Sequence, residues 1–185
     1  MYDEPLTIVV PEQELYDEVH NEFIPVPGCT LQLKHSLRSV AKWESKWNVA
    51  YLSNRKKTLR ESIDYIRCMT LSTNVNPVTY YALTEENFKA IEEYINAPMT
   101  ASFIPQPKEN RSRSNKMTAE EMYYCMISYG IPIEFDKWHL NRLIALIRVF
   151  DIKNQPKKRR RSEAQLIRDY AALNAKRCKE LNTRG

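Results

Sequence analysis

The chain has 185 residues, of which 43% are hydrophobic and 10% aromatic, enough to fold around one core of about 150 residues. Its charge is uneven: from Pro156 onward there are 10 basic and 3 acidic residues, whereas the first 155 residues carry 18 basic and 20 acidic ones. Only three glycines are present, which argues against the glycine-rich phosphate loops and nucleotide-binding fingerprints of many enzymes. The composition therefore predicts a nearly neutral body with a basic C-terminal extension, and favours binding or assembly.

The first 35 residues predict a small antiparallel sheet. Leu6–Val10 is rich in β-branched residues, and Thr30–Lys34 alternates apolar and polar residues with a period of two. Between them, Leu15-Tyr16 and Phe23-Ile24 flank an acidic turn and predict a hairpin, and Pro27-Gly28 predicts a further turn.

Residues 36–153 predict mainly helices. Ser36 is a suitable N-cap for a helix to about Trp47, and Thr58 and Thr118 each begin a capping box. Further helices are predicted to start at Asn76-Pro77 and at Thr84. Proline suits the first position of a helix, because the N–H that it lacks would have no partner within the helix. Gly130 is expected just after the end of the helix that Thr118 begins.

The strongest helical pattern follows Asp136, which we expect to be the N-cap of a helix largely buried at the centre of the body. Its apolar stripe consists of Leu140, Leu143, Ile144 and Ile147. His139 lies three residues after Asp136, a spacing that could belong to an acid–base pair. Capping explains Asp136 better, and we expect His139 to face solvent or an interface.

The organisation predicted from these patterns is an α+β fold over residues 1–155, with strands in 1–35 and helices in 36–153. Within it, residues 105–116 contain no hydrophobic residue and predict a mobile loop, whose Arg-Ser repeat we interpret as solubilising. Residues 156–185 predict a basic helical tail. It starts with the run Lys157, Lys158, Arg159, Arg160 and Arg161, and continues as a helix to about Leu181.

Candidate partner-binding residues come from this tail and from one pair of tryptophans. In the tail helix, the apolar residues Leu166, Ile167, Tyr170 and Leu173 form a narrow stripe that cannot bury much surface alone. Trp43 and Trp47 lie one helical turn apart and could form an aromatic platform, because tryptophan is enriched at interface hot spots. Burial of both in the core is the favoured interpretation.

No pattern points to catalysis, a metal or a cofactor, so the sequence predicts a protein that is not an enzyme. The four cysteines and three histidines have no zinc-ligand spacing, and we expect the cysteines to be reduced thiols. The acidic N-terminus differs from a signal peptide, and no apolar run approaches the ~20 residues of a membrane span. These observations predict a soluble intracellular protein without a membrane partner.

Several stretches together resemble a known family. The segment His35–Trp47 is similar to the block HSL-x-S-[VLI]-x-KWESKW of tailed-bacteriophage proteins encoded near the tape-measure gene and described as tail assembly chaperones. Further matching stretches are DYIRCMT at 64–70, YINAPMTA at 94–101, KWHLNRL at 137–143, ALNAKR at 172–177 and NTRG at 182–185. The resemblance implies a protein of the host cytoplasm that keeps the tape-measure protein soluble while tail-tube subunits assemble around it. It implies no catalytic residues.

Two other functions remain open from the sequence. The chain could be a virion structural protein, a tail or head–tail component whose C-terminal arm contacts neighbouring subunits. It could also bind nucleic acid through Lys157–Arg161, since phosphate contacts by basic residues supply salt-dependent affinity. The basic run is equally compatible with a nuclear-localisation-like patch or with an acidic or helical protein partner, and a homo-oligomer is open as well.

Overall fold

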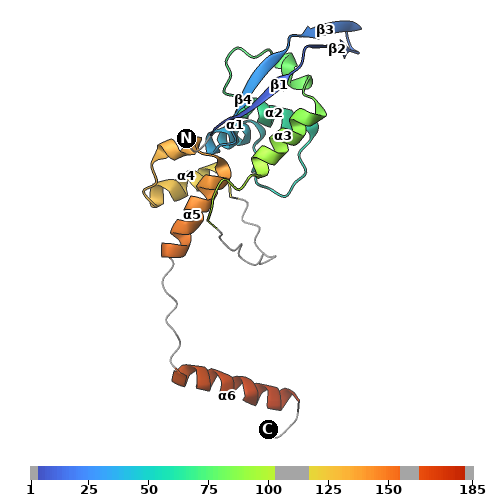
Figure 1. Cartoon of the computed structure of the whole chain (residues 1–185). Helices are drawn as coiled ribbons and strands as arrows, with labels where there is room; N and C mark the ends of the chain where they lie inside the picture. Colours follow the sequence, from blue (N-terminus) through green and yellow to red (C-terminus); the bar gives the residue numbers. More distant parts are fainter. Residues whose placement is uncertain (1–3, 103–116, 155–162, 182–185) are drawn as a thin grey trace. The chain divides into compact units, whose positions relative to one another are not determined.

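The computed structural model describes residues 4–102, 117–154 and 163–181 (Figure 1). The chain divides into two compact units, Met1–Lys153 and Asn154–Gly185, which we call the body and the arm. The strands of the body are β1 (Leu6–Val10), β2 (Gln13–Asp17), β3 (Glu22–Val26) and β4 (Cys29–Leu33). Its helices are α1 (Leu37–Trp47), α2 (Leu59–Met69), α3 (Glu85–Asn96), α4 (Ala119–Ser128) and α5 (Leu140–Asn154), with short 3-10 helices η1 (Pro77–Tyr81) and η2 (Ile133–Lys137). The arm contains α6 (Glu163–Glu180).

The α+β fold predicted from the sequence is confirmed, but the strands form two sheets where one was expected. β1 pairs antiparallel with β4, from Leu6 opposite Leu33 to Val10 opposite Cys29, and β2 pairs with β3 as a separate hairpin. Pro11 and Pro27 follow β1 and β3, and proline cannot donate to a ladder, so pairing is interrupted there. The segment between β3 and β4 passes close to the segment between β1 and β2. A Cβ on Gly28 would lie there only 3.1 Å from the backbone nitrogen of Glu12, which explains the glycine.

Helix α1 is the central element of the body and contacts α2, α4 and η2. Ser36 caps it as predicted, because its hydroxyl accepts a hydrogen bond from the Ser39 N–H (3.3 Å). Its buried face carries Leu37, Val40 and Trp43, which belong to the same core as the inward side chains of β1 and β4. The sheet β1–β4 is therefore joined to the helices through one hydrophobic core.

The capping boxes are confirmed. Thr58 and Glu61 bond reciprocally at the start of α2, and Thr118 and Glu121 do the same at the start of α4. Gly130 follows α4 with φ of +64°, the left-handed conformation that a helix C-terminus commonly requires of glycine.

The prediction for the start of α5 is wrong. Asp136 lies inside η2, and α5 begins only at Leu140, whose N–H donates to the His35 carbonyl (2.9 Å). Helix α5 is also less buried than expected, since Leu140, Leu143 and Ile147 are buried while Ile144 is only half-buried. A contact with the distant residue His35 therefore sets where this helix begins.

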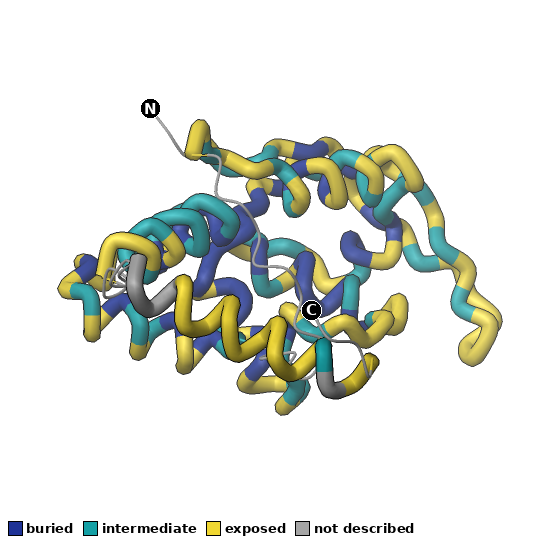
Figure 2. Tube along the Cα trace, turned by 90° about the horizontal axis from the view of Figure 1, so that it is seen from below, coloured by how far each residue is buried: buried dark blue, intermediate teal, exposed yellow. Residues whose placement is uncertain are grey.

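The helix predicted in the tail is present as α6, with exposed positions along most of its described length (yellow in Figure 2). The predicted loop at 105–116 and the basic run at 157–161 lie outside the described residues.

Candidate partner-binding surfaces

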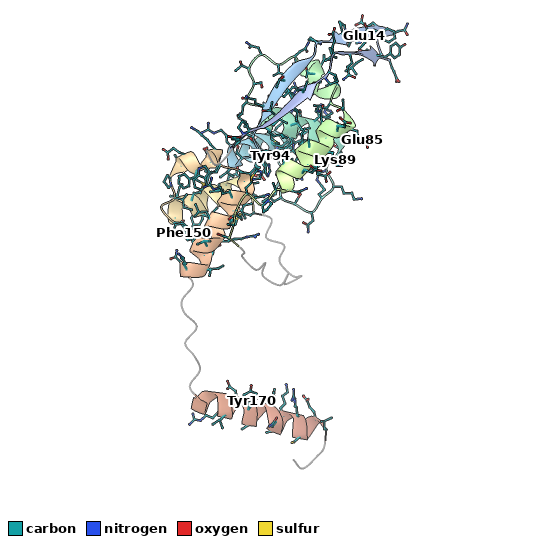
Figure 3. All side chains as sticks on the ribbon, in the orientation of Figure 1. Glu14, Glu85, Lys89, Tyr94, Phe150 and Tyr170 are labelled. Atoms are coloured by element: carbon teal, nitrogen blue, oxygen red, sulfur yellow. The ribbon has the colours of Figure 1, made fainter. Side chains whose placement is uncertain are left out.

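The apolar residues predicted to bind a partner are exposed on α6. Ile167 and Tyr170 are each 64% exposed and Leu173 is 45% exposed; Figure 3 labels Tyr170. The side chain of Leu166 and the whole of Lys157–Arg161 lie outside the described residues. Apolar side chains spaced at three and four residues on an exposed helix form a surface that another helix can cover.

The two tryptophans of α1 occupy different environments. Trp43 is fully buried, and its indole nitrogen donates to the Glu61 carbonyl (2.9 Å). Trp47 is half-buried and stacks on Trp43, with ring centroids 6.2 Å apart. Trp43 therefore belongs to the core, as the favoured interpretation had it. Trp47 does not match that interpretation fully, because it packs against the core but is only half-buried.

Asp136 and His139 are both buried in the body, and both hold its segments together. Two nitrogens of the Arg38 guanidinium donate to the Asp136 carboxylate at 3.1–3.4 Å, so Asp136 ties η2 to α1. His139 is fully buried, contrary to the prediction that it faces solvent or an interface, and its Nε2 lies 3.0 Å from the Tyr94 carbonyl. Its ring packs edge-on against His35, with centroids 5.0 Å apart. The fold brings His139 against the rings of His35 and Tyr94, which are distant in sequence, so no local pattern shows this burial.

His35 makes the stability of the body depend on pH. It is 2% exposed, and its Nδ1 hydrogen-bonds the Tyr65 hydroxyl at 2.5 Å. Burial lowers the pKa of His35 to about 3, with a smaller contribution from the neighbouring His139. The unfolded chain takes up a proton near pH 6.5 while the folded chain stays neutral, so stability falls as pH decreases from about 6.5 to 3.

We expect the His35→Gln variant to lose less stability than the wild type between pH 6 and pH 4, by about 2 kcal/mol. Urea denaturation at both pH values measures this difference. Leu59→Ala, a change at a residue that is 68% exposed, should keep the wild-type pH dependence. Parallel stability curves for the wild type and His35→Gln would contradict the assignment.

The hairpin β2–β3 is an acidic, partly apolar surface that the sequence reasoning did not select. The first 33 residues contain seven acidic residues and no lysine or arginine, a pattern that could have revealed it. Tyr16 and Phe23 lie opposite each other across the hairpin with ring centroids 5.1 Å apart, and they are 51% and 67% exposed. Val19 at the turn is 86% exposed.

The hairpin turn is held in shape by its own side chains. The Asp17 carboxylate accepts a hydrogen bond from the Val19 N–H (2.9 Å) and pairs with His20 Nδ1 (2.7 Å). The hydrogen bond with His20 is the main reason that the pKa of Asp17 is lowered. The Tyr16 hydroxyl donates to the Asn21 side-chain oxygen. The acidic groups and exposed rings are therefore presented by a defined loop conformation.

A basic pocket of about 480 Å³ lies beside the start of α1. Of the residues that the structure describes, four cationic ones line this pocket, namely Lys34, Arg38, Lys42 and Lys137, together with the acidic residue Glu134. Its apolar lining includes Leu71, which is 55% exposed, and Trp138, whose ring stacks on Phe135 with centroids 3.9 Å apart. The arrangement suits an acidic ligand that also has an apolar part.

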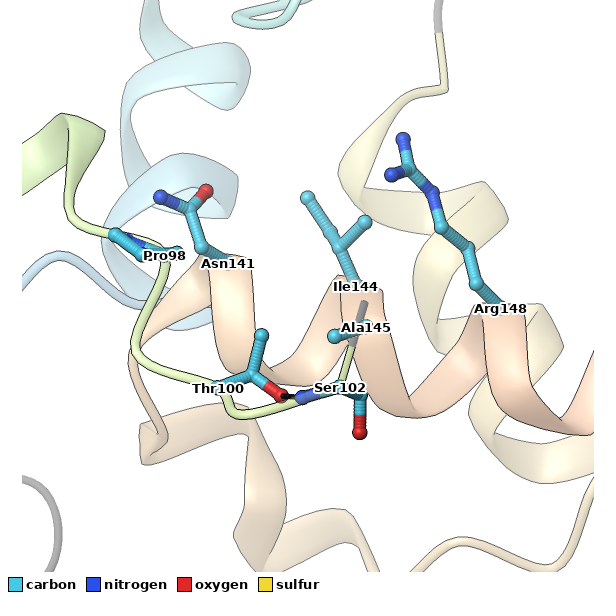
Figure 4. Close-up of a pocket in the computed structure, with 7 residues that line it drawn as sticks. All are labelled: Pro98, Thr100, Ser102, Asn141, Ile144, Ala145 and Arg148. Atoms are coloured by element: carbon cyan, nitrogen blue, oxygen red, sulfur yellow. Dashed lines mark hydrogen bonds between the residues drawn. The ribbon is translucent and has the colours of Figure 1, made fainter. Parts of the chain in front are cut away.

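A second hollow, of about 320 Å³, lies along α5 (Figure 4). The Asn141 amide donates to the carbonyls of Ile95 and Ala97 at 2.8 Å each, which holds the segment after α3 against α5. Among the described residues that line this hollow, Arg148 is the charged one, so the chemistry of the hollow is less distinctive than that of the basic pocket.

Comparisons with family models, curated proteins and solved structures found no match to this chain. Within the described residues, no group of three or more His, Cys, Asp or Glu side chains is placed to hold a metal ion. Across the same residues, no helix has both the length and the apolar character needed to cross a membrane. The four cysteines are all free thiols.

Proposed function

We propose that this chain is a tail assembly chaperone of a tailed bacteriophage, a binding protein and not an enzyme. It would act in the host cytoplasm, where it would bind the tape-measure protein through the arm while tail-tube subunits assemble. The observation that carries this proposal is the exposure of Ile167, Tyr170 and Leu173 on α6. The resemblance of the segments at 35–47 and 137–143 to that family supports the same function.

The physical argument concerns what an amphipathic helix can do for a helical partner. A lone helix of 18 residues is marginally stable in water, so covering its apolar side by a second helix stabilises both. A tape-measure protein consists mostly of amphipathic helix, and its apolar faces would aggregate unless another surface covers them. Arg168, Lys176 and Arg177 beside the stripe would add attraction to acidic partners.

Co-expression of the full chain with the tape-measure protein of the same phage tests this proposal. We expect the double variant Tyr170→Ser/Leu173→Ser to bind the tape-measure protein at least about tenfold more weakly than the wild type. Each of the two substitutions removes an apolar contact at the centre of the stripe. The soluble fraction of tape-measure protein and the amount co-purified with a tagged chain measure the effect.

The matched control makes the same kind of change on the body. Leu59→Ser/Tyr81→Ser replaces two residues that are 68% and 61% exposed, and it should leave the soluble tape-measure fraction unchanged. Equal solubilisation by both variants and the wild type would refute the role of α6. Recovery of the chain from purified particles at fixed copy number would favour a virion component. Retention of the chain on nucleic acid above about 0.2 M salt would favour a nucleic-acid-binding function.

A further inference from the structure

The acidic hairpin and the basic pocket lie at opposite ends of the same sheet. The hairpin β2–β3 continues from the end of the ladder where Val10 pairs with Cys29 (Figure 1). The pocket contains Pro5 and Lys34, which flank the other end, where Leu6 pairs with Leu33. Five residue pairs separate the two ends, about 15 Å of strand, so the hairpin of one body cannot enter its own pocket.

Their chemistry is complementary. The hairpin presents the carboxylate of Glu14 on the same face as the exposed rings of Tyr16 and Phe23, and it also exposes Glu18 and Glu22 next to the turn. Figure 3 labels Glu14 on this hairpin. An occupant of the basic pocket needs acidic groups for its cationic rim and apolar groups for Leu71 and the ring of Trp138. The hairpin supplies both from one short segment.

Both surfaces are also ordered before they meet. Hydrogen bonds to Asp17 and Asn21 hold the hairpin turn, and the Gln13 side chain anchors its base by donating to the Ala82 carbonyl (2.5 Å). In the pocket, Arg38 is fixed by Asp136 (3.1 Å), and the Arg142 guanidinium lies 4.0 Å from the Trp138 ring centre. Association of two preorganised surfaces loses little conformational entropy.

We propose that the hairpin β2–β3 of one copy binds in the basic pocket of a second copy, so that copies associate head to tail. Because the two surfaces differ, each copy that binds one neighbour still offers a hairpin or a pocket to the next. Such heterologous contacts close into a ring or continue as a filament. This self-association does not rest on the proposed function.

Sedimentation velocity on the full chain tests it. The wild type should form concentration-dependent oligomers that weaken as salt rises. Two variants each remove one side of the contact: Val19→Ser/Phe23→Ser alters the hairpin, and Lys42→Glu/Lys137→Glu alters the pocket. Each alone should raise the dissociation constant by about tenfold or more. Mixed together, they should form a 1:1 complex and nothing larger, because one intact hairpin and one intact pocket remain.

The controls separate this contact from others. Lys56→Glu/Lys89→Glu makes the same charge change at exposed sites away from the pocket, and should associate like the wild type. Glutamine at all five positions of Lys157–Arg161 should also preserve association; loss would place the basic run on the hairpin and overturn the proposal. A wild type that is monomeric at all concentrations, or a mixture that forms no 1:1 complex, would likewise overturn it.

Discussion

Replacing Trp43 by alanine is expected to lower the free energy of unfolding by about 3–5 kcal/mol. The ring is fully buried and contacts the rings of Trp47 and Tyr51, with the Tyr51 centroid 5.4 Å away. Its indole N–H also holds the Glu61 carbonyl at 2.9 Å. Alanine would leave a large cavity between α1 and α2, because neighbouring helices collapse only partly around a lost ring.

Urea denaturation measures this loss of stability. A second substitution separates the contribution of packing from that of the indole hydrogen bond. Trp43→Phe keeps much of the packing but removes the donor, so it should lose less stability than the alanine variant. Leu59→Ala, at a residue that is 68% exposed, should change the free energy of unfolding by less than about 0.5 kcal/mol. A loss below about 1 kcal/mol for Trp43→Ala would show that Trp43 is not a core residue in solution.

Local patterns predicted the parts of the fold that depend on neighbours in sequence. The capping boxes at Thr58 and Thr118 were predicted because a hydroxyl and a Glu three residues later satisfy backbone donors without help from the rest of the protein. The alternating segments that became β1 and β4 were predicted for the same reason, since alternation records which face is buried.

Contacts between distant residues could not be predicted in this way. Asp136 had the position of an N-cap, yet its carboxylate is bound by Arg38, 98 residues earlier. His139 looked like a surface residue, but the ring of His35, between β4 and α1, and the ring and carbonyl of Tyr94 in α3 pack against it. The separation of the hairpin from the sheet depends on how the chain passes Pro11 and Pro27, which turn patterns alone do not fix.

The candidate surfaces also differ in whether local sequence patterns can predict them. The stripe on α6 follows helical spacing, so the sequence alone indicates Ile167, Tyr170 and Leu173, which are exposed in the structure. The basic pocket combines residues from the end of β4, α1, α2 and η2, four segments that only the fold brings together. No spacing in the sequence joins Lys42 to Lys137.

Glu44 shows how much one such distant contact should contribute, and its replacement by alanine should cost about 3 kcal/mol of stability. It lies on the buried face of α1 and is 7% exposed. One carboxylate oxygen accepts the Tyr51 N–H (2.6 Å), and the other accepts the Ala119 N–H (2.8 Å). Alanine leaves both buried N–H groups without an acceptor, and each such group costs about 1–3 kcal/mol.

Because Ala119 is the first residue of α4, the Glu44 carboxylate also offsets the partial positive charge of that helix end. Glu44→Gln keeps one acceptor oxygen but turns a donor toward the other N–H, so its loss should be intermediate. Glu120→Ala is the matched control, since Glu120 is exposed in the same first turn of α4 and should matter by under about 1 kcal/mol.

Hydrogen exchange shows which amides lose protection when Glu44 is replaced, and by how much. In Glu44→Ala the amides of Tyr51 and Ala119 should exchange faster than in the wild type, and so should the first turn of α4, which the carboxylate holds to α1. In Glu120→Ala the Tyr51 amide should keep its protection. If the two variants had equal stability and equal exchange, the tie between α1 and α4 would lie in hydrophobic contacts, and Glu44 would be a dispensable neighbour of them.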